Sequence, residues 1–153
     1  MQTHRQSMHN LITYLVEDNP IILTNLIETL SELVNLEITA YSTSQSEANQ
    51  WLQSHRGLWH LAIVDLFLKQ GTGLGVLAAC RDRAPYQKVV ILTNYATPEI
   101  RERSAALGAD AVFDKSTELD RLMSFCTEQT LKLAQNSIPD GSPIALVQRP
   151  LLN

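Results

Sequence analysis

Polar residues that could do chemistry follow four short apolar runs of this 153-residue sequence, at positions where a structural role does not require them. Glu17 and Asp18 follow the first of these runs. The other three runs end in or near Asp65, Thr93 and Lys115. Ligands of an open α/β sheet bind outside the carboxyl ends of its strands. We therefore expect these side chains to gather at one edge if the runs are parallel strands.

Three carboxylates at one edge, those of Glu17, Asp18 and Asp65, would repel one another, and at least one pKa should rise. A hard divalent cation would remove this conflict, and oxygen ligands of this kind suit Mg²⁺. Lys115 adds a positive charge and Thr93 a hydroxyl donor, so the group as a whole suits a phosphoryl ligand. The carboxylate of Asp65 could itself attack phosphorus, because carboxylates are known to form aspartyl phosphates.

Five apolar runs alternate with helical patterns and predict the elements that position these residues. The predicted strands are 11–16, 37–41, 61–64, 88–92 and 111–113. Helices are expected from Asn19-Pro20 onward, over 44–55, from a flexible glycine-rich loop at 71–75 to about residue 83, over 97–108 and over 117–135. Strands separated by helices imply right-handed crossovers and a parallel sheet. The sequence therefore predicts an α/β fold, a doubly wound five-stranded parallel sheet of the (βα)5 type.

Composition narrows the class of protein further. The hydrophobic fraction of 44% is enough for a core, and the net charge of −4 disfavours a nucleic-acid surface. No apolar run approaches the roughly 20 residues of a membrane span. Cys80 and Cys126 are expected to be buried, reduced thiols, which suits a cytoplasmic protein.

The length predicts one domain, which we place at residues 10–135. Residues 1–9 form a polar leader without the apolar segment of a signal peptide. Residues 136–153 form a C-terminal tail in which we expect no output domain.

Four stretches of the chain resemble, in order, the receiver domain of two-component response regulators. They are YLVEDNP (14–20), IVDLFLKQGTGLGVL (63–77), VVILTNYA (89–96) and GADAVFDKS (108–116). The resemblance covers about residues 10 to 135. It implies a CheY-like, flavodoxin-like fold with the strand order 2-1-3-4-5.

The resemblance also implies roles for single residues. Asp65 matches the phospho-accepting aspartate. Glu17 and Asp18 match the acidic pair that holds Mg²⁺ together with Asp65. Phe67 matches the residue whose backbone carbonyl completes the metal shell.

Two further positions match groups that contact the phosphoryl group. Thr93 matches the hydroxyl that follows it, and Lys115 matches the lysine that pairs with it. The function implied is a signalling switch, phosphorylated by a sensor histidine kinase or a phosphotransfer protein, that changes the surface of its fourth helix, fifth strand and fifth helix. The output would pass to a downstream protein partner or a homodimer, without direct contact to nucleic acid or membrane. Self-phosphorylation and autodephosphorylation would be the only chemistry, so no separate enzyme activity is expected.

Several positions depart from the pattern of this family. Val112 stands where the switch aromatic is usual, and Phe113 would face the opposite side of a regular strand. Tyr95 could substitute for that ring. Asn94 replaces a small residue, and Ser116 replaces the proline that usually follows the lysine. These departures favour a second hypothesis, a phosphorylation-independent receiver-like module that binds a protein.

Two enzyme-like alternatives fit the residues less well. A phosphatase of the haloacid dehalogenase kind would want a second aspartate where Phe67 stands. A flavodoxin-like cofactor binder would share the fold but would not need three carboxylates at a phosphate-binding edge.

Structural roles are predicted for other notable residues. His60 is expected to be solvated, and Arg101 and Arg103 to lie on a solvated helix face. Phe125 is expected off the apolar stripe of the last helix, where it could pack on a partner.

Overall fold

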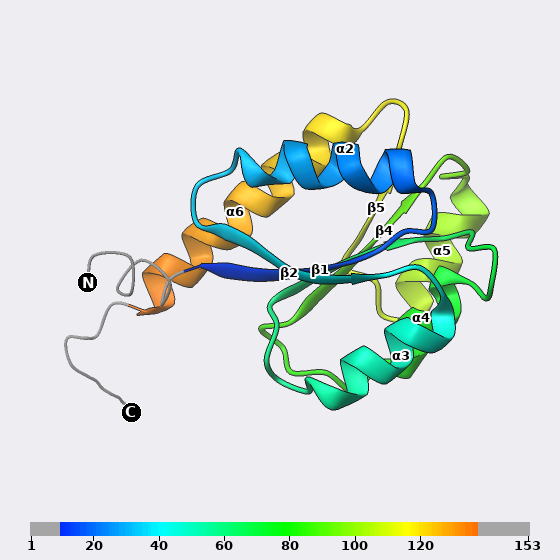
Figure 1. The fold of residues 1–153 in the computed structure, drawn as a ribbon, viewed down its shortest axis with the longest axis horizontal. Helices are drawn as coiled ribbons and strands as arrows, with labels where there is room; N and C mark the ends of the chain where they lie inside the picture. The colour runs from blue at the N-terminus through cyan, green and yellow to red at the C-terminus, as the bar shows by residue number, and fades with distance from the viewer. Residues whose placement is uncertain (1–9, 138–153) are drawn as a thin grey trace.

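The computed structural model describes residues 10–137, in which strands and helices alternate (Figure 1). The strands are β1 (Leu11–Val16), β2 (Leu36–Ser42), β3 (Leu61–Asp65), β4 (Lys88–Thr93) and β5 (Ala111–Asp114). The helices are α2 (Pro20–Ser31), α3 (Gln45–Ser54), α4 (Gly73–Ala79), α5 (Pro98–Ala106) and α6 (Leu119–Ser137). The last helix extends to Ser137, so residues 136 and 137, predicted to lie in the C-terminal tail, belong to α6. The leader at 1–9 and residues 138–153 of the tail lie outside the described residues, so the expectations for them stay predictions.

The strands form one sheet in the order β2-β1-β3-β4-β5, and every neighbouring pair is parallel. Helices α2 and α6 cover one face of the sheet, and α3, α4 and α5 cover the other (Figure 1). The predicted doubly wound fold and its strand order 2-1-3-4-5 are confirmed. Among residues 10–137, no helix has both the length and the apolar character needed to cross a membrane.

The two faces of the sheet carry separate hydrophobic cores. Alternate residues of a strand point to opposite faces. Leu61 and Ile63 of β3 therefore join the core under α2 and α6, while the residues after them join the core under α3 and α4. Cover on both faces explains why this central strand is a continuous apolar run. Cys80 and Cys126 are buried free thiols, as the sequence predicts.

Side-chain caps set the start of four helices. The caps of α2, α3, α4 and α5 are Asn19, Ser44, Thr72 and Thr97, and each accepts a backbone N–H of the first turn. A cap of this kind contributes about 1 kcal/mol to stability. These helices begin just beyond the carboxyl ends of strands, so the caps fix the path of the loops that carry the predicted site residues.

The glycine-rich segment at 71–75 is more ordered than the sequence predicts. Helix α4 already begins at Gly73 within this segment, and it ends at Ala79 rather than near Arg83. A Cβ on Gly73 would lie 2.3 Å from the backbone oxygen of Asp65, so only glycine allows the turn to pass this close to β3. Beyond the helix, the Arg83 guanidinium donates to backbone oxygens at both ends of the α4–β4 loop.

The prediction of a solvated His60 is wrong. Its ring nitrogen Nδ1 accepts the backbone N–H of Ile12 at 2.8 Å, and its own backbone N–H donates to the Ile12 oxygen at 2.8 Å. The ring also lies edge-on to Tyr86, with centroids 6.1 Å apart. His60 thus extends the β1–β3 pairing by one side-chain hydrogen bond. Burial lowers its pKa below the ordinary value of 6.5.

We expect acid to weaken the fold at His60, because a protonated Nδ1 cannot accept the Ile12 N–H. A base whose pKa is lowered by folding stabilises the protein above its unfolded pKa of 6.5, and this contribution is lost as pH falls toward the folded pKa. From about pH 7.5 to about pH 5.5, the wild type should lose about 0.5–1.5 kcal/mol more free energy of unfolding than His60→Gln. Urea denaturation at several pH values measures this difference. Equal losses in the two proteins would contradict the role given to His60.

Candidate functional site

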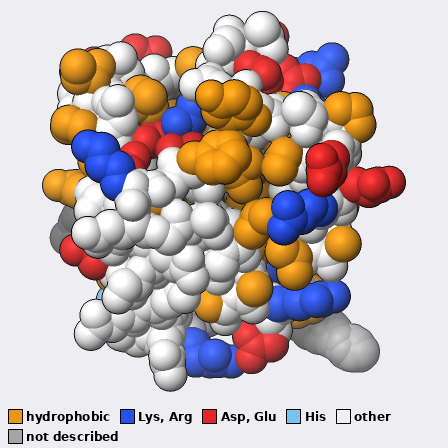
Figure 2. Space-filling view, turned by 90° about the vertical axis from the view of Figure 1, so that its right-hand side faces the viewer, with side chains coloured by type: hydrophobic (Ala, Val, Ile, Leu, Met, Phe, Trp, Pro, Cys, Tyr) orange, Lys and Arg blue, Asp and Glu red, His pale blue; other side chains and the backbone are white. Residues whose placement is uncertain are grey.

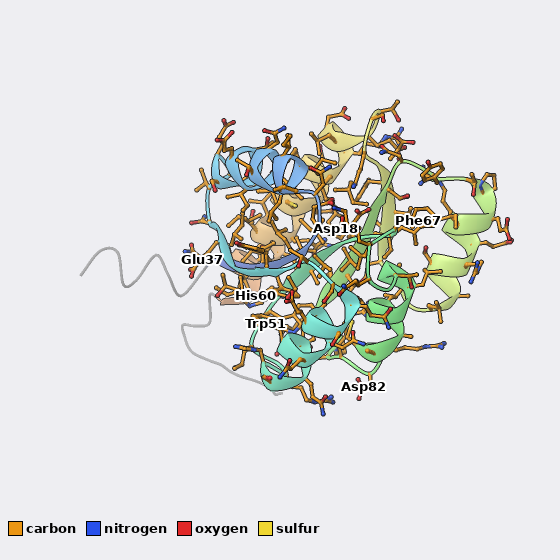
Figure 3. All side chains as sticks on the ribbon, turned by 45° about the vertical axis from the view of Figure 1, so that its right-hand side comes forward. Asp18, Glu37, Trp51, His60, Phe67 and Asp82 are labelled. Carbon is orange, nitrogen blue, oxygen red and sulfur yellow. The ribbon has the colours of Figure 1, made fainter. Side chains whose placement is uncertain are left out.

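Three carboxylates meet at the carboxyl ends of β1 and β3. Glu17 and Asp18 directly follow β1, and Asp65 is the last residue of β3. One carboxylate oxygen of each lies within 4.8 Å of the other two. Glu17 is 2% exposed and Asp65 is 7% exposed, so two of the three charges are buried. Figure 3 places Asp18 on the side of the strand ends, with Phe67 beyond it and His60 on the opposite side.

Lys115 joins the ends of three strands through its ammonium and its backbone. Its Nζ lies 2.8 Å from Oε1 of Glu17 and 3.0 Å from Oδ2 of Asp65. Its backbone N–H donates to the oxygen of Thr93 at 2.9 Å. Its side chain is only 13% exposed, so solvent screens these ion pairs weakly. One residue of the loop after β5 therefore contacts the end of β4 and two of the three carboxylates.

Backbone donors fix the other oxygens of the acidic pair. Oε2 of Glu17 accepts the N–H of Asn19 at 3.0 Å. Oδ2 of Asp18 accepts the N–H of Lys69 at 2.5 Å, which ties the end of β1 to the loop after β3. Phe67 lies on that same loop, opposite Thr72 in a short antiparallel bridge. The loop that was expected to supply a carbonyl ligand is thus held beside the carboxylates.

The electrostatics of the site show an excess of negative charge. Burial, followed by the nearby charge of Glu17, raises the pKa of Asp65 to about 7, although Lys115 acts in the opposite direction. For Lys115, burial alone would lower the pKa, but its hydrogen bonds and ion pairs with Glu17 and Asp65 outweigh burial and raise it. The ammonium therefore stays charged and still leaves the carboxylates undercompensated. An all-oxygen donor set with surplus negative charge fits a hard cation such as Mg²⁺.

The hydroxyl of Thr93 lies at the end of β4 next to this group. Thr93 is 1% exposed, and its Oγ1 accepts the backbone N–H of Tyr95 at 3.0 Å. Oδ1 of Asn94 accepts the hydroxyl of Ser116 at 3.1 Å, which links the loops after β4 and β5. The structure thus places Thr93, Lys115 and the three carboxylates at one edge of the sheet, together with the two departures at 94 and 116.

The aromatic residues near the site are arranged in two separate pairs. Phe113 is buried beneath α6 and packs edge-on against Phe125, with ring centroids 5.9 Å apart. The prediction that Phe125 lies off the apolar stripe is wrong, because it packs against this core. Val112 packs against the core on the other face of the sheet, as the alternation of β5 requires.

The second pair is exposed beside the carboxylates. Tyr95 and Phe67 are 61% and 54% exposed, and their rings meet edge to face with centroids 5.3 Å apart. Figure 2 views the face formed by the strand ends and shows hydrophobic side chains gathered next to acidic ones. Tyr95 is therefore joined to Thr93 through its backbone and to the loop after β3 through its ring.

The predicted solvated face at Arg101 is also wrong. Its guanidinium donates to the backbone oxygens of Ala96 and Val112 and to the carboxylate of Glu118. Helical spacing gives no sign of these contacts, because all three acceptors lie outside α5. Arg103 is exposed, as expected.

The model of the response regulator receiver domain family matches residues 13–127 of the chain. No curated protein matches the chain in sequence.

Many solved structures share the fold, among them the following three. The DNA-binding response regulator of the LuxR family from Staphylococcus aureus is 21% identical, with a TM-score of 0.69 over 78% of this chain and 98% of that one. The isolated receiver domain of RcsB from Salmonella enterica serovar Typhimurium, solved with the phosphomimetic BeF₃⁻, is 18% identical, with a TM-score of 0.66 over 81% and 98% of the two chains. The response regulator domain of Thermotoga maritima CheB is 14% identical, with a TM-score of 0.67 over 85% and 99%. At these identities the likeness shows the fold alone.

We expect Asp65→Asn to stabilise the metal-free protein at neutral and higher pH. The folded pKa of Asp65, about 7, lies above its ordinary 3.8, so this group contributes stability at low pH that is lost as pH rises through the folded value. At about pH 8 the variant should gain about 1–3 kcal/mol in free energy of unfolding, and the gain should shrink toward pH 5. Urea denaturation in a chelator measures it, with Asp120→Asn on the exposed start of α6 as the control. A variant that is less stable than the wild type at pH 8 would contradict the conclusion that the site carries surplus negative charge.

Proposed function

This chain belongs to the response regulator receiver domain family, and on that premise we propose that it is a switch in which Asp65 accepts a phosphoryl group. The observation that carries the proposal is the position of Lys115, with Nζ 2.8 Å from Glu17 and 3.0 Å from Asp65. This ammonium lies beside the nucleophile, where it can pair with an incoming phosphoryl oxygen. A phosphoacceptor signalling role follows from the family, and the residue roles below are our proposal.

The transfer is a displacement at phosphorus. A carboxylate oxygen of Asp65 forms the new O–P bond as the P–N bond of a donor phosphohistidine breaks. The leaving imidazole keeps the electron pair of that bond and takes up a proton from solvent. Lys115 then pairs with the phosphoryl group, and Thr93 turns its hydroxyl from the Tyr95 N–H toward a phosphoryl oxygen. Water attack on the acyl phosphate restores the carboxylate and releases phosphate.

Mg²⁺ is the cofactor that fits this donor set. Glu17, Asp18 and Asp65 would hold it with carboxylate oxygens, and Phe67 with its backbone carbonyl. When bound, the ion offsets negative charge on the phosphoryl oxygens. The pKa of Asp65 is raised in the protein without metal. Because a nearby cation lowers a carboxyl pKa, bound Mg²⁺ would also favour the ionised, nucleophilic form of Asp65.

The donor would be a sensor histidine kinase or a phosphotransfer protein. The response would be a change in the surface formed by α5, β5 and α6, read by a downstream protein partner or a second copy of the chain. The proposal includes no reaction on a separate substrate. Self-phosphorylation and autodephosphorylation are its whole chemistry.

A phosphorylation-independent binding module is the second candidate. It is favoured by Val112, which cannot supply a ring next to Thr93, and by Phe113, whose ring is committed to the core under α6. Under this hypothesis the protein would bind its partner equally well with and without a phosphoryl donor.

Phosphorylation by acetyl phosphate separates the two candidates. With Mg²⁺, the intact mass of the wild type should gain one phosphoryl group, and a chelator should abolish the gain. Asp65→Ala should show none, because the nucleophile is lost, whereas Asp120→Ala should behave as the wild type. A wild type that stays unmodified in Mg²⁺, while a known receiver domain is labelled in parallel, would overturn the proposal and favour the binding module.

Binding of Mg²⁺ without any donor gives a second prediction. Removing the charge of one ligand carboxylate should weaken binding at least about tenfold, because the ion is held mainly by charged oxygens. Isothermal titration of Asp18→Asn and wild type measures the change, with Asp120→Asn as the matched control. Equal affinities of wild type and Asp18→Asn would remove Asp18 from the metal site.

A further inference from the structure

The loop that carries Lys115 is held by a set of polar contacts rather than by a proline. Oδ1 of Asp114 accepts the backbone N–H groups of Ser116 at 2.7 Å and Thr117 at 3.1 Å. Oε1 of Glu118 accepts the N–H of Asp114 at 2.9 Å, and the N–H of Glu118 donates to the Asp114 oxygen at 2.9 Å. The residues on both sides of Lys115 are therefore fixed by two carboxylates, one at the end of β5 and one just before α6.

Arg101 of α5 anchors this loop from outside. Its Nη2 donates to Oε1 of Glu118 at 2.9 Å, and its Nη1 donates to the oxygen of Val112 at 2.8 Å. Its Nε reaches the oxygen of Ala96 in the loop after β4 at 3.2 Å. The hydrogen bond to Arg101, followed by the Asp114 N–H, holds the pKa of Glu118 below its usual value. One guanidinium thus contacts β5, the residue before α6 and the loop that follows Thr93.

These contacts lie around the proposed phosphoryl site without entering it. Arg101 touches none of the three carboxylates, but it joins the loop that directly follows Thr93 to the loop that carries Lys115. Two more hydrogen bonds join the same segments, from the Lys115 N–H to the Thr93 oxygen at 2.9 Å and from the Ser116 hydroxyl to Oδ1 of Asn94 at 3.1 Å. The side chain of Glu118 is 19% exposed and that of Arg101 is 41% exposed, so the pair is partly shielded from solvent.

We propose that Arg101 is a positioning residue for phosphoryl transfer, which acts by fixing the loop that presents Lys115 to Asp65. This inference rests on the proposed function. The planar guanidinium reaches its three acceptors through three different nitrogens held in a fixed fork, whereas a lysine presents all its donors from one nitrogen on a flexible stem. Because Arg101 belongs to α5, a ligand that moves α5 would alter the placement of Lys115, and the coupling must act equally in reverse.

A double-mutant cycle with Lys115 tests this role. The rate constant for labelling by acetyl phosphate in saturating Mg²⁺ is measured for wild type, Arg101→Gln, Lys115→Ala and the double variant. Arg101→Gln should slow labelling about tenfold, since small errors of position cost rate steeply. In the Lys115→Ala background the same change should have no further effect, because the group that Arg101 positions is gone. Arg103→Gln, on the exposed side of α5, should label as the wild type.

A second double-mutant cycle, a conservative variant and a metal-binding measurement distinguish a positioning role from a general loss of structure. Glu118→Gln should slow labelling to a similar extent, and combining it with Arg101→Gln should slow labelling no further. This second cycle tests the inference even if Lys115→Ala is labelled too slowly to measure. Arg101→Lys should restore only part of the rate. The affinity for Mg²⁺ should stay within about twofold of the wild type, because the metal ligands lie on other segments.

Two results would overturn the inference while leaving the proposed function intact. One is a labelled wild type whose rate is unchanged by Arg101→Gln. The other is a loss that is equally large in the Lys115→Ala background, or in the Glu118→Gln background, which would indicate a general structural role. A wild type that cannot be labelled at all would instead remove the proposed function on which the inference rests.

Discussion

The structure depends on one electrostatic constraint, the placement of three carboxylates close together with the ammonium of Lys115 against two of them. Parallel pairing of β1 and β3 brings Glu17 and Asp65 to the same edge, and burial there makes their repulsion costly. The ion pairs with Lys115 offset only part of that cost. The remaining repulsion and burial raise the pKa of Asp65. A protein optimised only for stability would not keep this arrangement, but a site that takes up a cation and a phosphoryl group would use it.

Most of the fold could be predicted because local signals agree with the global pattern. The apolar runs, the caps and the alternation of strands and helices all indicate a doubly wound sheet, and the boundaries of β1 are reproduced residue for residue. The errors fall where a distant contact decides the outcome. Gly73 must be glycine because its backbone passes close to that of Asp65, and His60 is half-buried and accepts a hydrogen bond from β1. Neither contact leaves a trace in local spacing.

In the candidate site, too, the residues at strand ends could be predicted from the sequence, but the contacts that support them could not. Strand ends indicate that Glu17, Asp65 and Lys115 converge, since the carboxyl ends of parallel strands share an edge. The supporting contacts could not be predicted, because they join side chains to backbone groups of other loops. Arg101, placed on a solvated face by its helical spacing, is the clearest case. Its contacts show how a loop without proline at position 116 is held in place after β5. The rings of Tyr95 and Phe67 pair at an exposed position near Thr93, whereas Val112 packs in the core.

The most direct test of the central claim is to locate the phosphoryl group chemically. Reduction of the labelled protein with borohydride converts an aspartyl phosphate to homoserine, which peptide mass spectrometry can place in the sequence. We expect homoserine at position 65 and at no other aspartate, in amounts that follow the extent of labelling. Homoserine at Asp18 or another carboxylate, or a phosphoryl group that survives on a different residue type, would contradict the assignment of Asp65 as the acceptor.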